Sequence, residues 1–203
     1  GKKLVTEMNT IGMLIDVSHI SDDAFYQVMD LSKTPVIASH SSLRKYTPGF
    51  ERNMNDDMLL ALKENGGVIQ INFGSSFVTA KAGSWGKQLK STKESAKKEG
   101  TKLSNDFDAA YRAKNPYPFA SLEQVLDHID HVVELIGIDY VGIGSDYDGV
   151  GDSLPIGLKD VSSYPNLVQG LMDRDYSDKD IKKILSGNLL RVLKQAEEYA
   201  KKH

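Results

Sequence analysis

No cysteine occurs among the 203 residues, which excludes disulfide bonds and thiolate chemistry. This absence does not identify the redox compartment, because exported proteins can also lack cysteine. Long apolar runs are missing as well: none approaches the roughly 20 residues that cross a bilayer, and Gly1, Lys2 and Lys3 lead into a helical pattern without a signal-peptide core. The localisation therefore stays open between the cytoplasm and the periplasm, or export from a bacterium.

The sequence also lacks an excess of charge of either sign. Its 25 Lys+Arg and 28 Asp+Glu residues give a formal net charge of −3. Because phosphate neutralisation needs a concentrated basic surface, we expect no nucleic-acid partner. The composition is otherwise that of a globular protein, with 40% hydrophobic and 26% charged residues. A chain of this length and composition is expected to fold as a single domain, residues 1–203.

Short apolar runs alternate with helical patterns along the chain. The apolar runs end in polar residues and span 12–18, 35–39, 67–73 and 140–145. The helical patterns between them lie near 22–31, 55–64 and 122–136. Strands that are apolar throughout and alternate with helices indicate a parallel sheet that is covered on both faces. We therefore predict an α/β fold with four adjacent, parallel strands in sequential order.

Four βα units amount to half of a (β/α)8 barrel of the TIM type, and four strands cannot close a barrel. We therefore expect these to be about the last four units of such a barrel. The strand edges that half a barrel exposes would then be covered by upstream sequence or by a second copy, which makes a homo-oligomer one expected assembly.

A long insertion separates the third predicted strand from its helix. It spans residues 74–120, and residues 81–114 carry nine Lys/Arg against four Asp/Glu, a local balance of +5. We interpret this segment as a solvated helical excursion over the rim of the sheet. The alternative is a lid that attracts anionic substrates.

Two histidines stand at the ends of consecutive predicted strands. His19 and His40 are 21 residues apart, about the length of one βα unit. The carboxyl ends of parallel strands form the rim that holds the chemistry in α/β folds, so we expect the two side chains to be neighbours there. A lone histidine at such a place is more often a hydrogen-bonded rim residue. The repeated placement favours a zinc site, since neutral imidazole on a rigid scaffold is a preferred zinc ligand.

The fourth predicted strand ends in a carboxylate followed by a turn pattern. Asp146 stands at the rim after two glycines and is placed to act as a catalytic base. The pattern Asp-Tyr-Asp-Gly is also typical of a turn. We assign the turn to Asp148 and Gly149, with Gly149 expected to supply a positive φ.

Arg52 lies in a loop 12 residues after His40, on the same predicted rim. A guanidinium is the natural bidentate partner of a carboxylate, so Arg52 is a candidate for binding the carboxylate of a substrate. Taken alone, an arginine in such a loop is more often part of a surface salt bridge.

The segment Asp127-His128-Ile129-Asp130-His131 resembles a metal-binding cluster. Helical spacing, however, places His128 and His131 on the helix after the third strand, away from the rim. We therefore predict structural hydrogen bonding at the helix surface, and metal binding is the alternative.

Several of these segments, in this order and spacing, resemble motifs of the membrane (renal) dipeptidase family, whose members are binuclear zinc dipeptidases. The matching segments are 12–19, 35–41, Arg52-Asn53, Asp56-Asp57, 127–131, 144–149, 157–161, Tyr164-Pro165 and 187–192. The resemblance covers nearly the whole chain outside the insertion and corresponds to the C-terminal portion of the family.

The resemblance implies a metallo-dipeptidase with two zinc ions and a dipeptide substrate. His19 and His40 match the two histidines that bind one zinc ion. Arg52 matches the arginine that holds the terminal carboxylate of the substrate, and Asp146 matches the acidic residue near the substrate amine and the attacking water. The family's His-x-Asp pair and bridging Glu have no counterpart before Gly12.

Because those ligands are missing, the resemblance implies that the parent protein is an active dipeptidase and that the isolated chain is inactive. Two alternatives remain open from the sequence. One is a non-catalytic half-barrel or degenerate relative. The other is a different amidohydrolase-type barrel that acts on lactones or cyclic amides.

Overall fold

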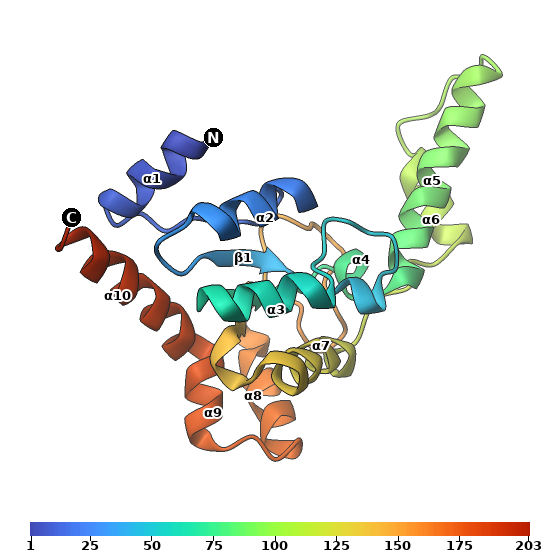
Figure 1. Ribbon diagram of the computed structural model, residues 1–203. Helices are drawn as coiled ribbons and strands as arrows, with labels where there is room; N and C mark the ends of the chain where they lie inside the picture. Colours follow the sequence, from blue (N-terminus) through green and yellow to red (C-terminus); the bar gives the residue numbers. More distant parts are fainter.

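The computed structural model describes residues 1–203 and contains a three-stranded parallel sheet in the order β1-β2-β3, covered by helices (Figure 1). The strands are β1 (Ile37–Ser41), β2 (Val68–Ile71) and β3 (Val141–Ile143). The α-helices are α1 (Lys2–Thr10), α2 (Asp22–Leu31), α3 (Asp56–Asn65), α4 (Ser75–Val78), α5 (Ala80–Lys98), α6 (Phe107–Lys114), α7 (Leu122–Ile136), α8 (Tyr164–Asp173), α9 (Asp178–Lys182) and α10 (Asn188–Ala200). Shorter turns of helix are η1 (Arg44–Tyr46), η2 (Ile138–Tyr140), η3 (Val161–Ser163) and the π-helical η4 (Lys183–Gly187).

The predicted parallel, sequential strand order is confirmed for the three strands. Ile37 in β1 pairs with Val68 in β2, and Ile69 in β2 pairs with Val141 in β3, all in parallel. Every residue of β2 is buried, as expected for a central strand that is covered on both faces.

The first predicted strand, residues 12–18, is not a strand in the structure. It lies along β1 in parallel as expected, but it makes only one bridge, between Asp16 and Ile37. The chain takes a positive φ at Gly12 (73°) and at His19 (68°), so the extended part between them is short. The prediction was right about the neighbour and wrong about the length of the pairing.

The predicted helices are confirmed nearly to the residue because their ends carry local capping signals. The Ser21 hydroxyl accepts a hydrogen bond from the Ala24 N–H at the start of α2. Ser121 and Gln124 form a capping box at the start of α7. At the end of α3, Gly66 takes a left-handed conformation with φ of 80°.

The helices after successive strands lie side by side, with α2 against α3, α3 against α7 and α7 against α8 (Figure 1). One hydrophobic cluster of 28 buried residues joins them to the sheet, with Phe25 from α2, Leu59 from α3 and Leu126 from α7 among its fully buried members. The helices α5 and α6 project away from this core as an arm, whereas α1 and α10 lie together near the two termini (Figure 1). None of the helices combines the length and the apolar character needed to cross a bilayer.

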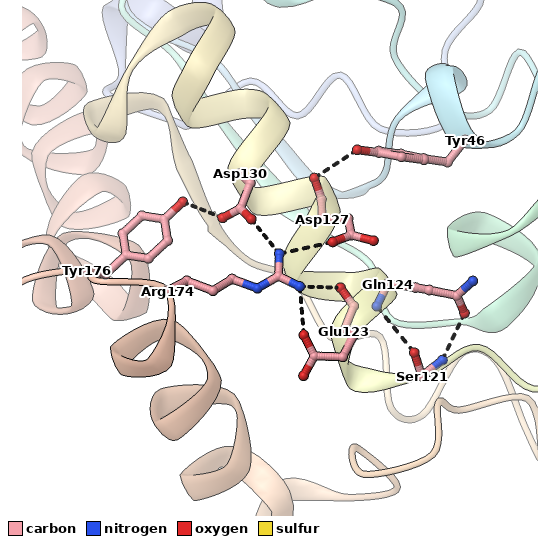
Figure 2. Close-up of polar contacts among 8 residues, drawn as sticks. All are labelled: Tyr46, Ser121, Glu123, Gln124, Asp127, Asp130, Arg174 and Tyr176. Atoms are coloured by element: carbon pink, nitrogen blue, oxygen red, sulfur yellow. Dashed lines mark hydrogen bonds and ion pairs between the residues drawn. The ribbon is translucent and has the colours of Figure 1, made fainter.

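An ion-pair network fastens α7 to the segment between α8 and α9 (Figure 2). The guanidinium of Arg174 contacts Glu123 at 2.7 Å and Asp127 at 3.0 Å, and it also pairs with Asp130. Tyr176 donates a hydrogen bond of 2.7 Å to the same Asp130 carboxylate. The guanidinium of Arg174 therefore forms ion pairs with three carboxylates from successive turns of α7.

We expect Arg174→Ala to lower the free energy of unfolding by roughly 1–2 kcal/mol, because the partly exposed carboxylates lose a shared partner and repel one another. Arg174→Lys should recover less than half of the loss, since an ammonium cannot reproduce the forked contacts. Urea denaturation measures both, with Lys182→Ala, at an exposed position of α9, as the matched control. A loss below about 0.5 kcal/mol, the scale of ordinary surface substitutions, would contradict the expectation.

Candidate active site

The structure brings His19 and His40 together. Their Nε2 atoms lie 2.8 Å apart, and their ring centroids are separated by 4.8 Å. His40 is part of β1, whose register with β2 is irregular between Ala38 and Ser41. His19 lies just past the bridge to β1 with a φ of 68°. Irregular strand geometry and a positive φ at a residue other than glycine are features that cluster at functional sites.

A chain of hydrogen bonds sets the proton position on His40. Ser39 Oγ donates to Asp16 Oδ2 at 2.5 Å and lies 2.7 Å from His40 Nδ1. Because the serine proton is directed to the carboxylate, Nδ1–H of His40 donates to the serine oxygen, which leaves Nε2 with a lone pair directed at Nε2 of His19, 2.8 Å away. This is the tautomer that binds a metal through Nε2, with the kind of carboxylate-linked support that orients metal-binding histidines.

Sequence reasoning missed Asp16 and Ser39. Asp16 also accepts hydrogen bonds from the N–H groups of Ser39 at 3.1 Å and Ser18 at 2.9 Å, so it holds the first run against β1. Asp16 lies in the predicted run 12–18 and Ser39 in the predicted run 35–39, at the point where each run gives way to polar residues. Their position beside the two histidines was the signal that could have identified them.

His19 is favoured in its neutral form. Burial lowers the pKa of His19, and the positive charge of Arg52 lowers it further. The carboxylates of Asp146 and Asp16 oppose this change but do not cancel it. A neutral imidazole is the form that binds a metal ion.

Asp146 lies on the same rim after β3. Its backbone has a φ of 59°, and its Oδ2 atom accepts a hydrogen bond of 2.8 Å from the side chain of Asn72. The turn that follows is closed by the Gly149 N–H, which donates to the Asp146 carbonyl at 3.0 Å. The expected positive φ at Gly149 is therefore wrong, since Asp146 carries it. Gly149 is needed for space instead: a Cβ atom there would lie 2.0 Å from Asp146 Oδ1.

Asn72 is a second residue that sequence reasoning missed. It follows β2 and is fully buried, and its Oδ1 atom accepts a hydrogen bond of 2.7 Å from the Gly74 N–H. This second contact fixes which way the amide faces, so its NH2 group is directed at Asp146. The available signal was a polar residue near the end of the run 67–73.

Arg52 is half-buried beside the histidines and is not part of a surface salt bridge. Its guanidinium donates to Ser41 Oγ at 2.7 Å and to the carbonyl oxygen of His40 at 2.6 Å, and it lies 5.5 Å from the ring of Phe77. Its Nε–H is buried without a hydrogen-bond partner. Burial lowers the pKa of Arg52, whereas the Asp146 carboxylate raises it. An arginine that is held by neutral groups keeps its charge available to an anion.

The two histidines of α7 are structural, as predicted, but they are buried and not at the helix surface. His128 is 0% exposed, and burial lowers its pKa to about 4. His131 lies between Asp56, at 2.9 Å from Nε2, and the Lys45 ammonium, at 2.8 Å from Nδ1. No group of three or more His, Asp or Glu side chains is placed to hold a metal ion within residues 1–203.

The histidine pair, the half-buried arginine and the aspartate thus share the carboxyl-terminal rim of a parallel sheet, which is where α/β enzymes carry their catalytic groups. This arrangement defines an α/β protein with a polar cluster at the carboxyl-terminal rim of its parallel sheet. The family model described as membrane dipeptidase (peptidase family M19) matches residues 1–203, and the chain belongs to that family.

Curated relatives agree with this assignment. The chain is 34% identical over 202 residues to dipeptidase 3 of Mus musculus, a match that covers 100% of this chain and 33% of the relative. It is 37% identical over 200 residues to dipeptidase tcpJ of Claviceps purpurea, covering 98% of this chain and 38% of that protein. The chain therefore spans only about a third of the length of these relatives.

Solved structures share its fold. The probable dipeptidase PvdM from Pseudomonas aeruginosa superposes with a TM-score of 0.81 at 31% identity, over 98% of this chain and 54% of that one. A metallo peptidase from Rhodobacter sphaeroides, liganded with a phosphinate mimic of the dipeptide L-Ala-D-Ala, gives a TM-score of 0.74 at 28% identity. That match covers 97% of this chain and 46% of the Rhodobacter chain.

Proposed function

We propose that this chain contributes to zinc-dependent hydrolysis of dipeptides. The observation that carries the proposal is the convergence of the Nε2 atoms of His19 and His40, which lie 2.8 Å apart, with the proton of His40 held on Nδ1 by Ser39 and Asp16. Two imidazoles that meet at the carboxyl-terminal edge of a parallel sheet are suitable zinc donors.

The donor set fits one zinc ion in part, with His19 and His40 as the residues that would hold it. A zinc pair, when bound, would polarise the scissile carbonyl and lower the pKa of water. The chain's own residues orient the donors: Asp16 and Ser39 keep the proton of His40 on Nδ1, and Asp146 is held toward the rim by Asn72.

Arg52 would bind the substrate carboxylate, and Asp146 would contact the substrate amine and take part in proton transfer. The Nε–H of Arg52 is buried and has no hydrogen-bond partner, which supports the proposal that an anionic ligand binds beside it. The Rhodobacter relative is liganded with a phosphinate mimic of a dipeptide, which supports the same substrate class here. A site that anchors both an amine and a carboxylate leaves no room for a longer peptide.

The corresponding architecture would be a (β/α)8 barrel to which these 203 residues contribute about the last four units, as a single domain with the insertion at 74–120. Two histidines are fewer than the three protein ligands that a catalytic zinc normally has. We therefore propose that the remaining ligands lie outside this chain, and that a larger protein or an assembly of copies completes the site. The alternative is an amidohydrolase that acts on lactones or cyclic amides. Such substrates need no arginine to bind a terminal carboxylate, so the placement of Arg52 favours dipeptides.

We expect the 203-residue chain alone to bind zinc weakly and to leave dipeptides intact, whereas a protein that also carries the missing ligands does both. The two imidazoles lack the carboxylate ligands, and supporting hydrogen bonds cannot replace them. Metal analysis after dialysis against zinc buffer, combined with a dipeptide panel, tests both proteins. Stoichiometric zinc in the isolated chain, with turnover abolished by His19→Ala, would show that copies of this chain complete the site themselves.

A further inference from the structure

His128 bridges two segments that are far from it in sequence. Its ring, fully buried on α7, accepts a hydrogen bond of 3.1 Å at Nδ1 from the Leu43 N–H, and its Nε2 lies 3.0 Å from the Val78 carbonyl oxygen. A backbone N–H can only donate and a carbonyl can only accept, so the ring is neutral with its proton on Nε2. The histidine therefore joins the chain just after β1 to the last residue of α4.

Asn53 joins the same two segments one residue earlier in each. Its Oδ1 atom accepts from the Ser42 N–H at 3.2 Å, and its Nδ2 donates to the Phe77 carbonyl at 2.7 Å. Asn53 is also fully buried. The two side chains thus form a double cross-link, from residues 42 and 43 on one side to residues 77 and 78 on the other.

The guanidinium of Arg52 lies between the cross-linked segments. It donates to His40 and Ser41, the two residues before the first segment, and it packs against the ring of Phe77 in the second. Both surfaces that hold the cation are therefore kept in place by the same pair of links. Loss of the His128 ring would leave a buried N–H and a buried carbonyl unpaired, and the two segments would move to satisfy them.

We propose that His128 is a positioning residue for Arg52: by tying the end of β1 to α4, it fixes the guanidinium that faces the site. The consequence for a dipeptide carboxylate rests on the proposed function, whereas the placement of the guanidinium does not. His128 touches neither substrate nor the histidine pair in this arrangement, and it acts only through Arg52.

The test follows hydrogen exchange of arginine Nε–H groups by NMR in the ¹⁵N-labelled chain. Arg52 and Arg191 both have a buried Nε–H without a partner, and Arg191 donates to the Gly66 carbonyl at the opposite end of the strands, so it is an internal reference. Arg52→Lys and Arg191→Lys assign the two signals. Leu167→Ala, in the fully buried part of α8, is the control for general destabilisation.

In His128→Leu, we expect hydrogen exchange at the Arg52 Nε–H to accelerate at least about tenfold relative to the Arg191 Nε–H. The leucine side chain cannot bond the Leu43 N–H or the Val78 carbonyl, so the two segments that hold Arg52 are no longer linked by this side chain. His128→Asn should fall between wild type and leucine, since its amide oxygen can still accept from the Leu43 N–H. Leu167→Ala should leave the ratio of the two rates unchanged. An unchanged ratio in both His128 variants would overturn the proposal, and the asparagine variant decides alone if the leucine variant does not fold.

A kinetic experiment separates this inference from the proposed function. In a protein with the complete ligand set, His128→Leu should raise KM for a dipeptide roughly ten- to a hundredfold, and the double variant with Arg52→Ala should lose little more than Arg52→Ala alone. Additive losses would refute the link between the two residues. Absence of wild-type turnover would refute the proposed function, while the exchange ratio would still decide the role of His128.

Discussion

Replacement of His40 by alanine is expected to reduce zinc affinity by more than about a hundredfold in a protein with the complete ligand set. The change removes a direct ligand, whereas loss of a group that only supports a ligand typically reduces affinity by about ten- to a hundredfold. Ser39→Ala is the matched comparison, because it keeps the imidazole and removes the hydroxyl that accepts its Nδ1 proton. We expect that variant to fall within the smaller range.

Competition with a chelator, followed by metal analysis, measures both affinities. The order of the two variants is the critical result, since a direct ligand must matter more than its support. Equal affinities for wild type and His40→Ala would exclude His40 as a ligand. If Ser39→Ala bound zinc as tightly as wild type, the hydrogen-bond chain from Asp16 would have no part in holding the metal site.

Replacement of Arg52 by alanine is expected to lower kcat/KM for dipeptides by about ten- to a hundredfold, mainly through weaker binding. Loss of a charge-assisted hydrogen bond corresponds to roughly 1.5–3 kcal/mol. Arg52→Lys should lose a similar amount, because an ammonium lacks the planar fork that matches a carboxylate.

Steady-state kinetics with a dipeptide panel measure this effect, with Arg112→Ala as the matched control. Arg112 is an arginine of the projecting arm that pairs with Asp152 at 3.0 Å, and its loss should leave the kinetics near wild type. Unchanged kinetics in Arg52→Ala would refute the assignment of the substrate carboxylate to this residue.

The helices α2, α3 and α7 and the three strands could be predicted because their signals are local. Ser21, Asn55 and Ser121 cap helices through hydrogen bonds within three residues, so the helix starts are visible in the sequence. The first strand could not be predicted as closely. Its length depends on how the chain turns away at His19, and a positive φ at a histidine leaves no clear mark in the pattern.

The placement of the candidate site residues on one rim could be predicted, and the contacts that support them could not. His19, His40 and Asp146 follow directly from polar residues at strand ends. Asn72 and Asp146 are 74 residues apart, and the sequence gives no reason to pair them. The burial of His128 was missed because helical spacing alone could not show that its ring would meet the backbone at Leu43, 85 residues away.

Local sequence patterns are sufficient to predict the alternation of apolar runs and helices, the parallel order of the strands and the strand ends at which the polar residues lie. These follow from periodicity, caps and the direction of parallel connections, which act over a few residues or one βα unit. The folded chain is needed to establish the proton position on His40, the neutral groups that hold Arg52 and the buried contacts of His128. Each of these depends on atoms from distant segments that meet within hydrogen-bond distance, and packing of the whole core, not local pattern, sets such meetings.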